Sequence, residues 1–81
     1  MKKIMIIEDD NAICNELSDL LENNNYKPII LRNFKNSLNE IIESSPDLIL
    51  LDINIPYING EKLLQDLRKT SNIPVIMVTS R

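Results

Sequence analysis

The segment Asp47–Ile53 has the sequence DLILLDI, in which four consecutive apolar residues lie between carboxylates. A short, uninterrupted apolar run is typical of a strand that is buried on both faces of a parallel sheet. Lys3–Ile7, with the sequence KIMII, has the same character and is followed at once by Glu8, Asp9 and Asp10. We therefore expect two buried strands that end on acidic residues, and Asp47–Ile53 is the better candidate for a central one.

In the segments between the predicted strands, the apolar residues recur at the spacing of amphipathic helices. Tyr26–Leu31 and Pro74–Val78 are two further strands, and Pro28 favours an edge position for the first because proline cannot donate to a ladder. Asn33 is placed to cap the second helix. The alternation β-α-β-α-β-α-β predicts parallel strands with right-handed crossovers in an open α/β sheet. Three stripes predict the helices: Ile13, Leu17, Leu20 and Leu21; Phe34, Leu38, Ile41 and Ile42; Leu63, Leu64 and Leu67.

The composition of the 81 residues excludes several classes of function. Nine Lys and Arg against 12 Asp and Glu give a net charge of −3, which argues against a nucleic-acid surface on this segment. The single Gly60 excludes a glycine-rich phosphate loop, and the lack of histidine excludes a Ser-His-Asp triad. One cysteine, Cys14, cannot form an intrachain disulfide and is expected in the core. The apolar runs are too short to span a bilayer, so we expect a soluble, cytoplasmic domain without a membrane partner.

Polar side chains follow three of the predicted strands. Glu8–Asp10 ends the first strand, Asp52 ends the third, and Thr79 and Ser80 end the fourth. Because the carboxyl ends of parallel strands meet at one edge of a sheet, these groups should lie together. Carboxylates this close repel one another unless a hard cation lies between them, and Mg²⁺ prefers such oxygen ligands. The sequence therefore predicts a divalent cation at this edge.

Each of these motifs has a simpler interpretation when it is taken alone. The acidic triplet is also expected of a solvated strand end in which Asp10 or Asn11 caps the following helix. Asp52 suits a turn, and Thr79 with Ser80 suits the cap of a further helix. Only the combination of the three segments favours a site.

The combination resembles the receiver domain of two-component response regulators. The resemblance rests on Ile6–Asp10, on Leu50–Pro56 with Gly60, and on Val75–Ser80. The Asp-x-x-x-Pro-x-x-x-Gly spacing is its most specific element, and the strand types resemble regulators that carry a winged-helix DNA-binding output domain. The resemblance implies a flavodoxin-like parallel sheet of order 2-1-3-4-5.

Carried over residue by residue, the resemblance implies roles for five residues. Asp52 would be the phosphoacceptor, taking a phosphoryl group from a phosphohistidine of a sensor histidine kinase. Asp9 and Asp52 would bind Mg²⁺ directly, Glu8 would hold the ion through water, and Asn54 would offer its backbone carbonyl. Thr79 would donate a hydrogen bond to a phosphoryl oxygen. This arrangement suits phosphoryl transfer, which needs an in-line nucleophile and neutralisation of the transferring oxygens.

The resemblance also implies parts that these 81 residues do not contain. Receiver domains have a fifth strand that ends in a phosphate-binding lysine, an aromatic switch residue and two further helices. Residues 1–81 are therefore interpreted as an N-terminal receiver fragment with an incomplete sheet of order 2-1-3-4, and Arg81 does not replace the lysine by position. Phosphorylation should be weak or absent without that lysine, and the uncovered edge of Pro74–Val78 should promote self-association.

Two other functions stay open beside the phosphoacceptor. Phosphatases resembling haloacid dehalogenases also form an aspartyl phosphate, but they carry an acidic residue two positions after the nucleophile, where this sequence has Asn54. An amide cannot act as a general acid, so we expect no enzyme activity. The second alternative is a receiver-like interaction or dimerisation module that never takes a phosphoryl group. Tyr26 and Tyr57 are expected on the surface or at a partner contact.

Overall fold

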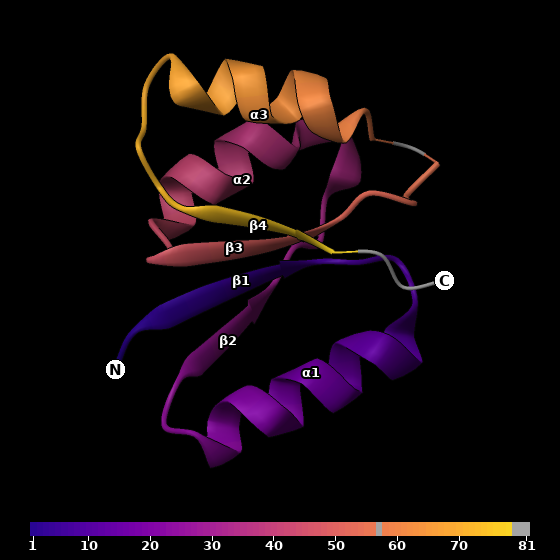
Figure 1. Ribbon diagram of the computed structural model, residues 1–81, viewed down its shortest axis with the longest axis vertical. Helices are drawn as coiled ribbons and strands as arrows, with labels where there is room; N and C mark the ends of the chain where they lie inside the picture. Colours follow the sequence, from indigo (N-terminus) through magenta and orange to yellow (C-terminus); the bar gives the residue numbers. More distant parts are fainter. Residues whose placement is uncertain (57, 79–81) are drawn as a thin grey trace.

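The computed structural model describes residues 1–56 and 58–78. In that part of the chain a parallel sheet has the strand order β2-β1-β3-β4, with α1 on one face and α2 and α3 on the other (Figure 1). The predicted alternation, strand order and parallel direction are confirmed. The elements are β1 (Lys3–Ile7), α1 (Asn11–Asn23), β2 (Lys27–Ile30), the 3₁₀ turn η1 (Phe34–Asn36), α2 (Ser37–Ser44), β3 (Leu48–Asp52), α3 (Gly60–Arg68) and β4 (Val75–Val78).

The strand register aligns the ends of the two central strands. Ile7 lies opposite Leu51 where β1 pairs with β3, and Asp52 lies opposite Val78 where β3 pairs with β4. The residues that follow β1 and β3 are therefore neighbours at the carboxyl edge of the sheet. Pro28 lies in β2, which is an edge strand as its proline predicts.

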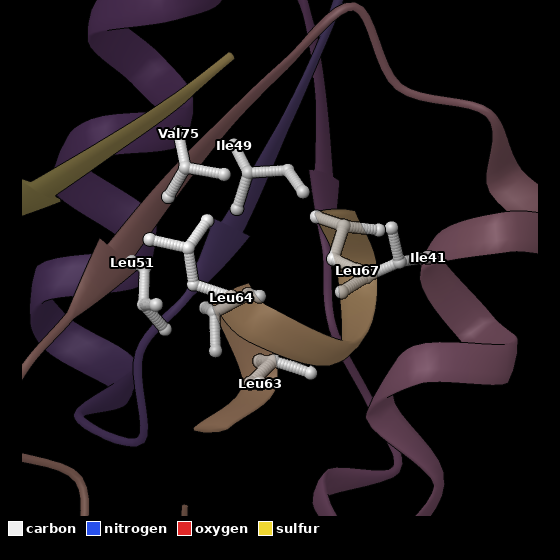
Figure 2. A pocket seen from close by; sticks show the side chains of 8 residues that line it. Ile41, Ile49, Leu51, Leu63, Leu64, Leu67 and Val75 are labelled. Atoms are coloured by element: carbon white, nitrogen blue, oxygen red, sulfur yellow. The ribbon is translucent and has the colours of Figure 1, made fainter. Parts of the chain in front are cut away.

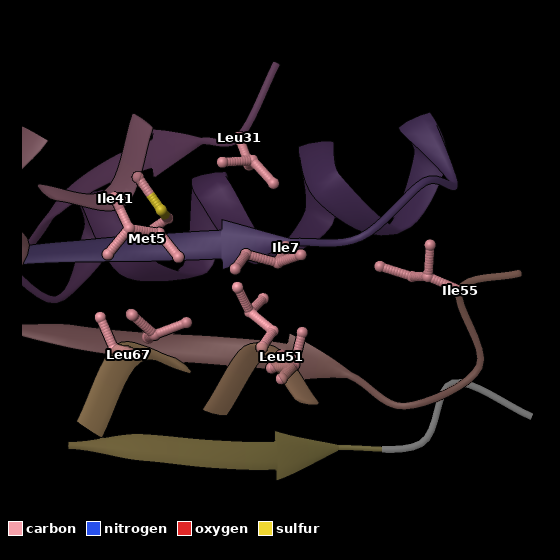
Figure 3. Packing of buried hydrophobic residues seen from close by; sticks show 9 residues of the cluster. Met5, Ile7, Leu31, Ile41, Leu51, Ile55 and Leu67 are labelled. Carbon is pink, nitrogen blue, oxygen red and sulfur yellow. The ribbon is translucent and has the colours of Figure 1, made fainter. Parts of the chain in front are cut away.

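The main core lies between the sheet and the helices α2 and α3. Met5 and Ile7 of β1 point into it with Leu51 of β3, and they meet Ile41 of α2 and Leu67 of α3 (Figure 3). All five side chains are almost fully buried. Burial of this much apolar surface is the main stabilising term of such a fold.

The packing of this core leaves little space. Figure 2 shows Ile49 and Val75 of the sheet on one side of a cavity and Leu63 and Leu64 of α3 on the other. The volume of this cavity is only about 10 Å³. A volume of this size is at the limit for one water molecule. The core under α2 and α3 is therefore a packing interface with no room for a ligand.

The face of the sheet under α1 is less completely covered. Cys14 of α1 is buried, as predicted. Leu20, which the helical stripe places with Ile13 and Leu17, is 58% exposed, so the prediction that it is a buried member of the stripe is wrong. The reason is tertiary: α1 is the one helix that the described residues place on this face of the sheet, so no second helix packs beside it.

The second helix also differs from its prediction. Asn33 caps η1, since its Oδ1 accepts hydrogen bonds from the N–H groups of Lys35 and Asn36, and α2 begins three residues later than the cap implies. The carboxylate of Glu40 accepts from the N–H groups of Arg32 and Asn33, which ties this turn back onto α2. These competing local hydrogen bonds divide the predicted helix into two pieces.

Two further results concern the helices. Phe34 lies in η1 and packs against the core from there, whereas Ile42 of α2 is 47% exposed. The prediction that these four residues form one continuous buried stripe on a single helix is therefore wrong.

Among the described residues, the helices are all too short or too polar to be membrane-spanning segments.

Candidate functional site

Three carboxylates lie together at the carboxyl edge of the sheet. Glu8 and Asp9 follow β1, and Asp52 is the last residue of β3. One carboxylate oxygen from each of the three lies within 4.8 Å of the others. The structure thus brings together three of the four residues that the sequence proposes as metal ligands.

Two of these three carboxylates are held away from solvent, and Asp9 is half-buried. Glu8 is 5% exposed and Asp52 is 2% exposed. Burial raises the pKa of Glu8, and the nearby carboxylates of Asp52 and Asp9 raise it further, although a hydrogen bond from the N–H of Asp10 (3.0 Å) opposes the shift. Negative charge is therefore concentrated where its solvation is poor.

Local turns orient the ends of both strands. Oδ1 of Asp52 accepts a hydrogen bond from the backbone N–H of Asn54 (2.9 Å), which fixes the first turn after β3. Asn54 is exposed and lies two residues after Asp52, at the start of the loop that leads to α3. The predicted use of its backbone carbonyl as a ligand stays a prediction.

The acidic triplet serves two purposes. Oδ1 of Asp10 accepts hydrogen bonds from the N–H groups of Ala12 (2.9 Å) and Ile13 (3.3 Å), so Asp10 is the N-cap of α1. The simpler interpretation is therefore right for Asp10. It does not account for Glu8 and Asp9, whose side chains join Asp52 instead.

Cys14 connects α1 to the backbone of the site. The thiol of Cys14 donates to the backbone oxygen of Glu8 (3.3 Å) and is buried. Burial raises the pKa of this thiol, and the charges of Glu8, Asp10 and Asp9 raise it further. Cys14 is thus held as a neutral packing residue beneath the site.

One feature beside the carboxylates was not anticipated from the sequence. A cavity of about 190 Å³ opens between α1 and the sheet, next to Glu8 and Asp52. Its apolar lining comes from Ile6 and Leu50 of the sheet, from Ile13 and Leu17 of α1, and from Val78 of β4. Alternation along β1 and β3 contains this signal, because Ile6 and Leu50 lie opposite each other in register and share one face.

Three residues with predicted positions or roles lie outside the described part of the chain. Thr79 was expected to contact the phosphoryl group, Ser80 was expected beside it at the end of the fourth strand, and Tyr57 was expected on the surface or at a partner contact. Val78 precedes Thr79 and lies beside Asp52 in register. The last described residue of β4 is therefore at the same edge of the sheet as the carboxylates.

The donor set fits a hard divalent cation. Three carboxylates with oxygens this close offer the ligand type that Mg²⁺ prefers. Oδ1 of Asp9 is buried and has no hydrogen-bond partner among the described residues. Because buried polar oxygens are normally paired, this atom supports a ligand at the site.

Comparison with known proteins gives a consistent result. Residues 4–81 match the model of the response regulator receiver domain. The chain is 35% identical over all 81 residues to the sensory transduction protein BceR of Halalkalibacterium halodurans. It covers 35% of that protein, so it spans about a third of the length of this relative.

Solved structures agree with the sequence match. The N-terminal domain of the nisin resistance regulator NsrR superimposes with a TM-score of 0.88 at 43% identity, covering 95% of this chain and 65% of that one. A complex of the histidine kinase ThkA with the response regulator TrrA matches with a TM-score of 0.83 at 27% identity, covering 99% of this chain and 70% of that one. The shared fold is the flavodoxin-like sheet, here with strand order β2-β1-β3-β4.

Proposed function

This chain belongs to the response regulator receiver domain family, and we propose that Asp52 is its phosphoacceptor in a two-component phosphorelay. The observation that carries the proposal is the position of Asp52 at the end of a central strand, within 4.8 Å of carboxylate oxygens of Glu8 and Asp9. A nucleophile beside a cation site is the arrangement that phosphoryl transfer requires.

The proposed step is a displacement at phosphorus. A carboxylate oxygen of Asp52 forms a bond to the phosphorus of a phosphohistidine, the P–N bond breaks, and the imidazole leaves with a proton taken from solvent. Bound Mg²⁺ would supply charge neutralisation to the transferring oxygens. Glu8 and Asp9 would hold the ion with Asp52 and the carbonyl of Asn54, and Thr79 would donate to a phosphoryl oxygen.

The proposed phosphodonor is a sensor histidine kinase. The similarity to TrrA, which was solved in complex with the kinase ThkA, supports this partner. The similarity to longer regulatory proteins such as BceR supports an output beyond these residues. We propose that this output controls transcription. DNA would be contacted by the output part of the protein and not by the acidic residues 1–81. We also propose that the domain works in the cytoplasm.

The site favours signalling over phosphatase chemistry. Asn54 occupies the position two residues after Asp52, and its N–H donates to the Asp52 carboxylate. An amide at this position cannot act as the general acid that a phosphatase mechanism needs. The aspartyl phosphate is therefore proposed as a signal and not as the intermediate of an enzyme.

We also propose that the 81-residue chain self-associates through the β4 edge, Pro74–Val78. β4 pairs with β3 on one side only among the described residues, and Ile76 and Met77 are 50% and 39% exposed. An apolar strand with an open edge is a template for pairing with another chain.

The test of the phosphoacceptor is the intact mass of the chain after incubation with Mg²⁺ and acetyl phosphate. We expect partial gain of one phosphoryl group, its loss in Asp52→Asn, and its retention in Asp19→Asn, a matched change on the exposed surface of α1. Full-length BceR serves as the positive control. A version of this chain extended through the fifth strand decides between the outcomes. Gain of the phosphoryl group only in the extended version would place the chemistry in the full domain. If BceR is modified and the extended version is not, the phosphoacceptor proposal is wrong, and an interaction module is the better description.

A further inference from the structure

Arg32 lies beside Glu8 at the carboxyl edge of the sheet. Ile6 of β1 pairs with Ile30 of β2, and the N–H of Leu31 donates to the oxygen of Ile6 (3.0 Å), so the pairing continues past the end of β2. Glu8 and Arg32 each follow this pair by two residues. Because the backbones of neighbouring strands are about 5 Å apart, a positively charged residue is placed next to the carboxylates of the site.

The side chain of Arg32 belongs to the face of the sheet that α1 covers. Side chains two residues apart along a strand share a face, and Ile6 lines the cavity under α1, so Glu8 and Arg32 are on that face as well. Burial raises the pKa of the Cys14 thiol, three carboxylates raise it further, and the charge of Arg32 lowers it. The sulfur of Cys14 is 3.3 Å from the backbone oxygen of Glu8. The guanidinium charge therefore acts at the end of β1, where the site begins.

Arg32 is fixed by its backbone, while its charge stays unpaired. The carboxylate of Glu40 accepts hydrogen bonds from the N–H groups of Arg32 (2.9 Å) and Asn33 (2.8 Å), which holds the chain at this point. The residue is exposed. Among the described residues both ion pairs are made by Asp66 of α3, and Arg32 takes part in neither. Its guanidinium charge is therefore not neutralised by an ion pair within that part of the chain.

We propose that Arg32 sets the balance between cations and anions at this edge, weakening the binding of Mg²⁺ and favouring the approach of an anionic phosphoryl group. The carboxylates of Glu8, Asp9 and Asp52 attract a cation. A positive charge beside them repels the same cation, and it attracts the oxygens of a phosphoryl group. The effect on the phosphoryl group rests on the phosphoacceptor function proposed above, whereas the effect on Mg²⁺ does not.

A solvated surface arginine would have neither effect if salt and water screened its charge completely. Exposed charges more than about 10 Å apart are largely screened at about 0.1 M salt, but buried charges are screened much less. Glu8 is 5% exposed and Asp52 is 2% exposed. Their burial preserves the field of a neighbouring charge, so the two interpretations of Arg32 predict different measurements.

The first test is calorimetric titration of the 81-residue chain with Mg²⁺ at low ionic strength. Arg32→Gln should lower the Kd for Mg²⁺ by about threefold, because one repulsive charge is removed. Lys27→Gln is the matched control, since it removes the same charge from an exposed residue at the other end of β2, about 16 Å away. The control should leave the Kd unchanged, and circular dichroism verifies that each variant is folded.

The second test measures the rate at which acetyl phosphate modifies Asp52 at saturating Mg²⁺, in the version extended through the fifth strand. Arg32→Gln should slow this rate by about threefold, and about 0.5 M salt should remove most of the difference. Arg32→Lys should keep both the rate and the Kd of the parent, because the proposal requires the charge and not the planar guanidinium. Tighter Mg²⁺ binding together with slower modification identifies a charge effect, since a loss of packing would weaken both.

The outcomes separate this proposal from the phosphoacceptor proposal. A Kd for Mg²⁺ that does not fall in folded Arg32→Gln, or a parent chain that binds no Mg²⁺, would overturn the effect on the cation. An unchanged or faster rate in a protein that is modified at Asp52 would overturn the effect on the phosphoryl group. If the extended parent is not modified at all, the phosphoacceptor proposal is wrong and the phosphoryl effect is wrong with it, while the titration by itself decides the effect on Mg²⁺.

Discussion

The two faces of the sheet use the same strands but are covered to different extents. Under α2 and α3 the side chains of Met5, Ile49 and Leu51 are at most 2% exposed. Under α1 the strand β1 is buried, while Ile76 of β4 is half exposed and a cavity opens beside Asp52. The comparison teaches that, among the described residues, the closest packing lies under α2 and α3, and that Glu8 and Asp52 lie beside the less completely packed face.

The largest effect should come from removing a side chain on the covered face. Leu67→Ala deletes a residue that is 1% exposed at the centre of the core. The lost burial and the remaining cavity should lower the free energy of unfolding by about 2–5 kcal/mol. Urea denaturation followed by circular dichroism measures this change, and a loss below about 1 kcal/mol would show that the core relaxes around the cavity.

The next effect concerns α1, which depends more on local hydrogen bonds. Asp10→Ala removes the acceptor for the N–H groups of Ala12 and Ile13, and should cost about 1 kcal/mol of unfolding free energy. Asp10→Asn keeps an acceptor and is the control. Equal losses in both variants, measured by thermal denaturation, would mean that the charge and not the cap stabilises α1.

The carboxylate cluster should make stability depend on pH. The pKa of Glu8 is raised above its ordinary value of 4.5, so protonation of Glu8 favours the folded state. Its stabilising effect is complete below pH 4.5 and is lost as the pH rises through the raised pKa. Glu8→Gln should therefore have a higher Tm than the parent chain at neutral pH in EDTA, and the difference should disappear in acid.

Magnesium provides the control for that experiment. If Glu8 helps to hold the ion, Mg²⁺ should raise the Tm of the parent chain more than that of Glu8→Gln, because a ligand stabilises the state that binds it. Thermal melts with and without Mg²⁺ measure both values. An equal increase of Tm in the two proteins would mean that Glu8 does not help to hold the ion.

The smallest effect should come from the open side of α1. Leu20→Ala makes the same chemical change as Leu67→Ala, but Leu20 is 58% exposed. We expect a change within about 0.5 kcal/mol of unfolding free energy, which denaturation under the same conditions measures. A loss comparable to that of Leu67→Ala would show that something covers this side of α1 in solution.

Local pattern was sufficient for the strands and for the alternation of the fold. Lys3–Ile7 has the predicted bounds, because a continuous apolar run of this length suits a strand buried on both faces. The second helix was less predictable. Asn33 is a good cap in any context, but which turn it caps depends on Glu40. The carboxylate of Glu40 accepts a hydrogen bond from the N–H of Asn33, seven residues earlier.

For the candidate site, the sequence by itself determined that acidic residues end two buried strands. Parallel order then requires Glu8, Asp9 and Asp52 to meet at one edge. Only the tertiary structure decided that Asp10 turns away to cap α1, that Glu8 and Asp52 are buried, and that Leu20 and Ile76 are exposed. The physical reason is that periodicity shows which residues share a face, whereas exposure depends on which other element packs against that face.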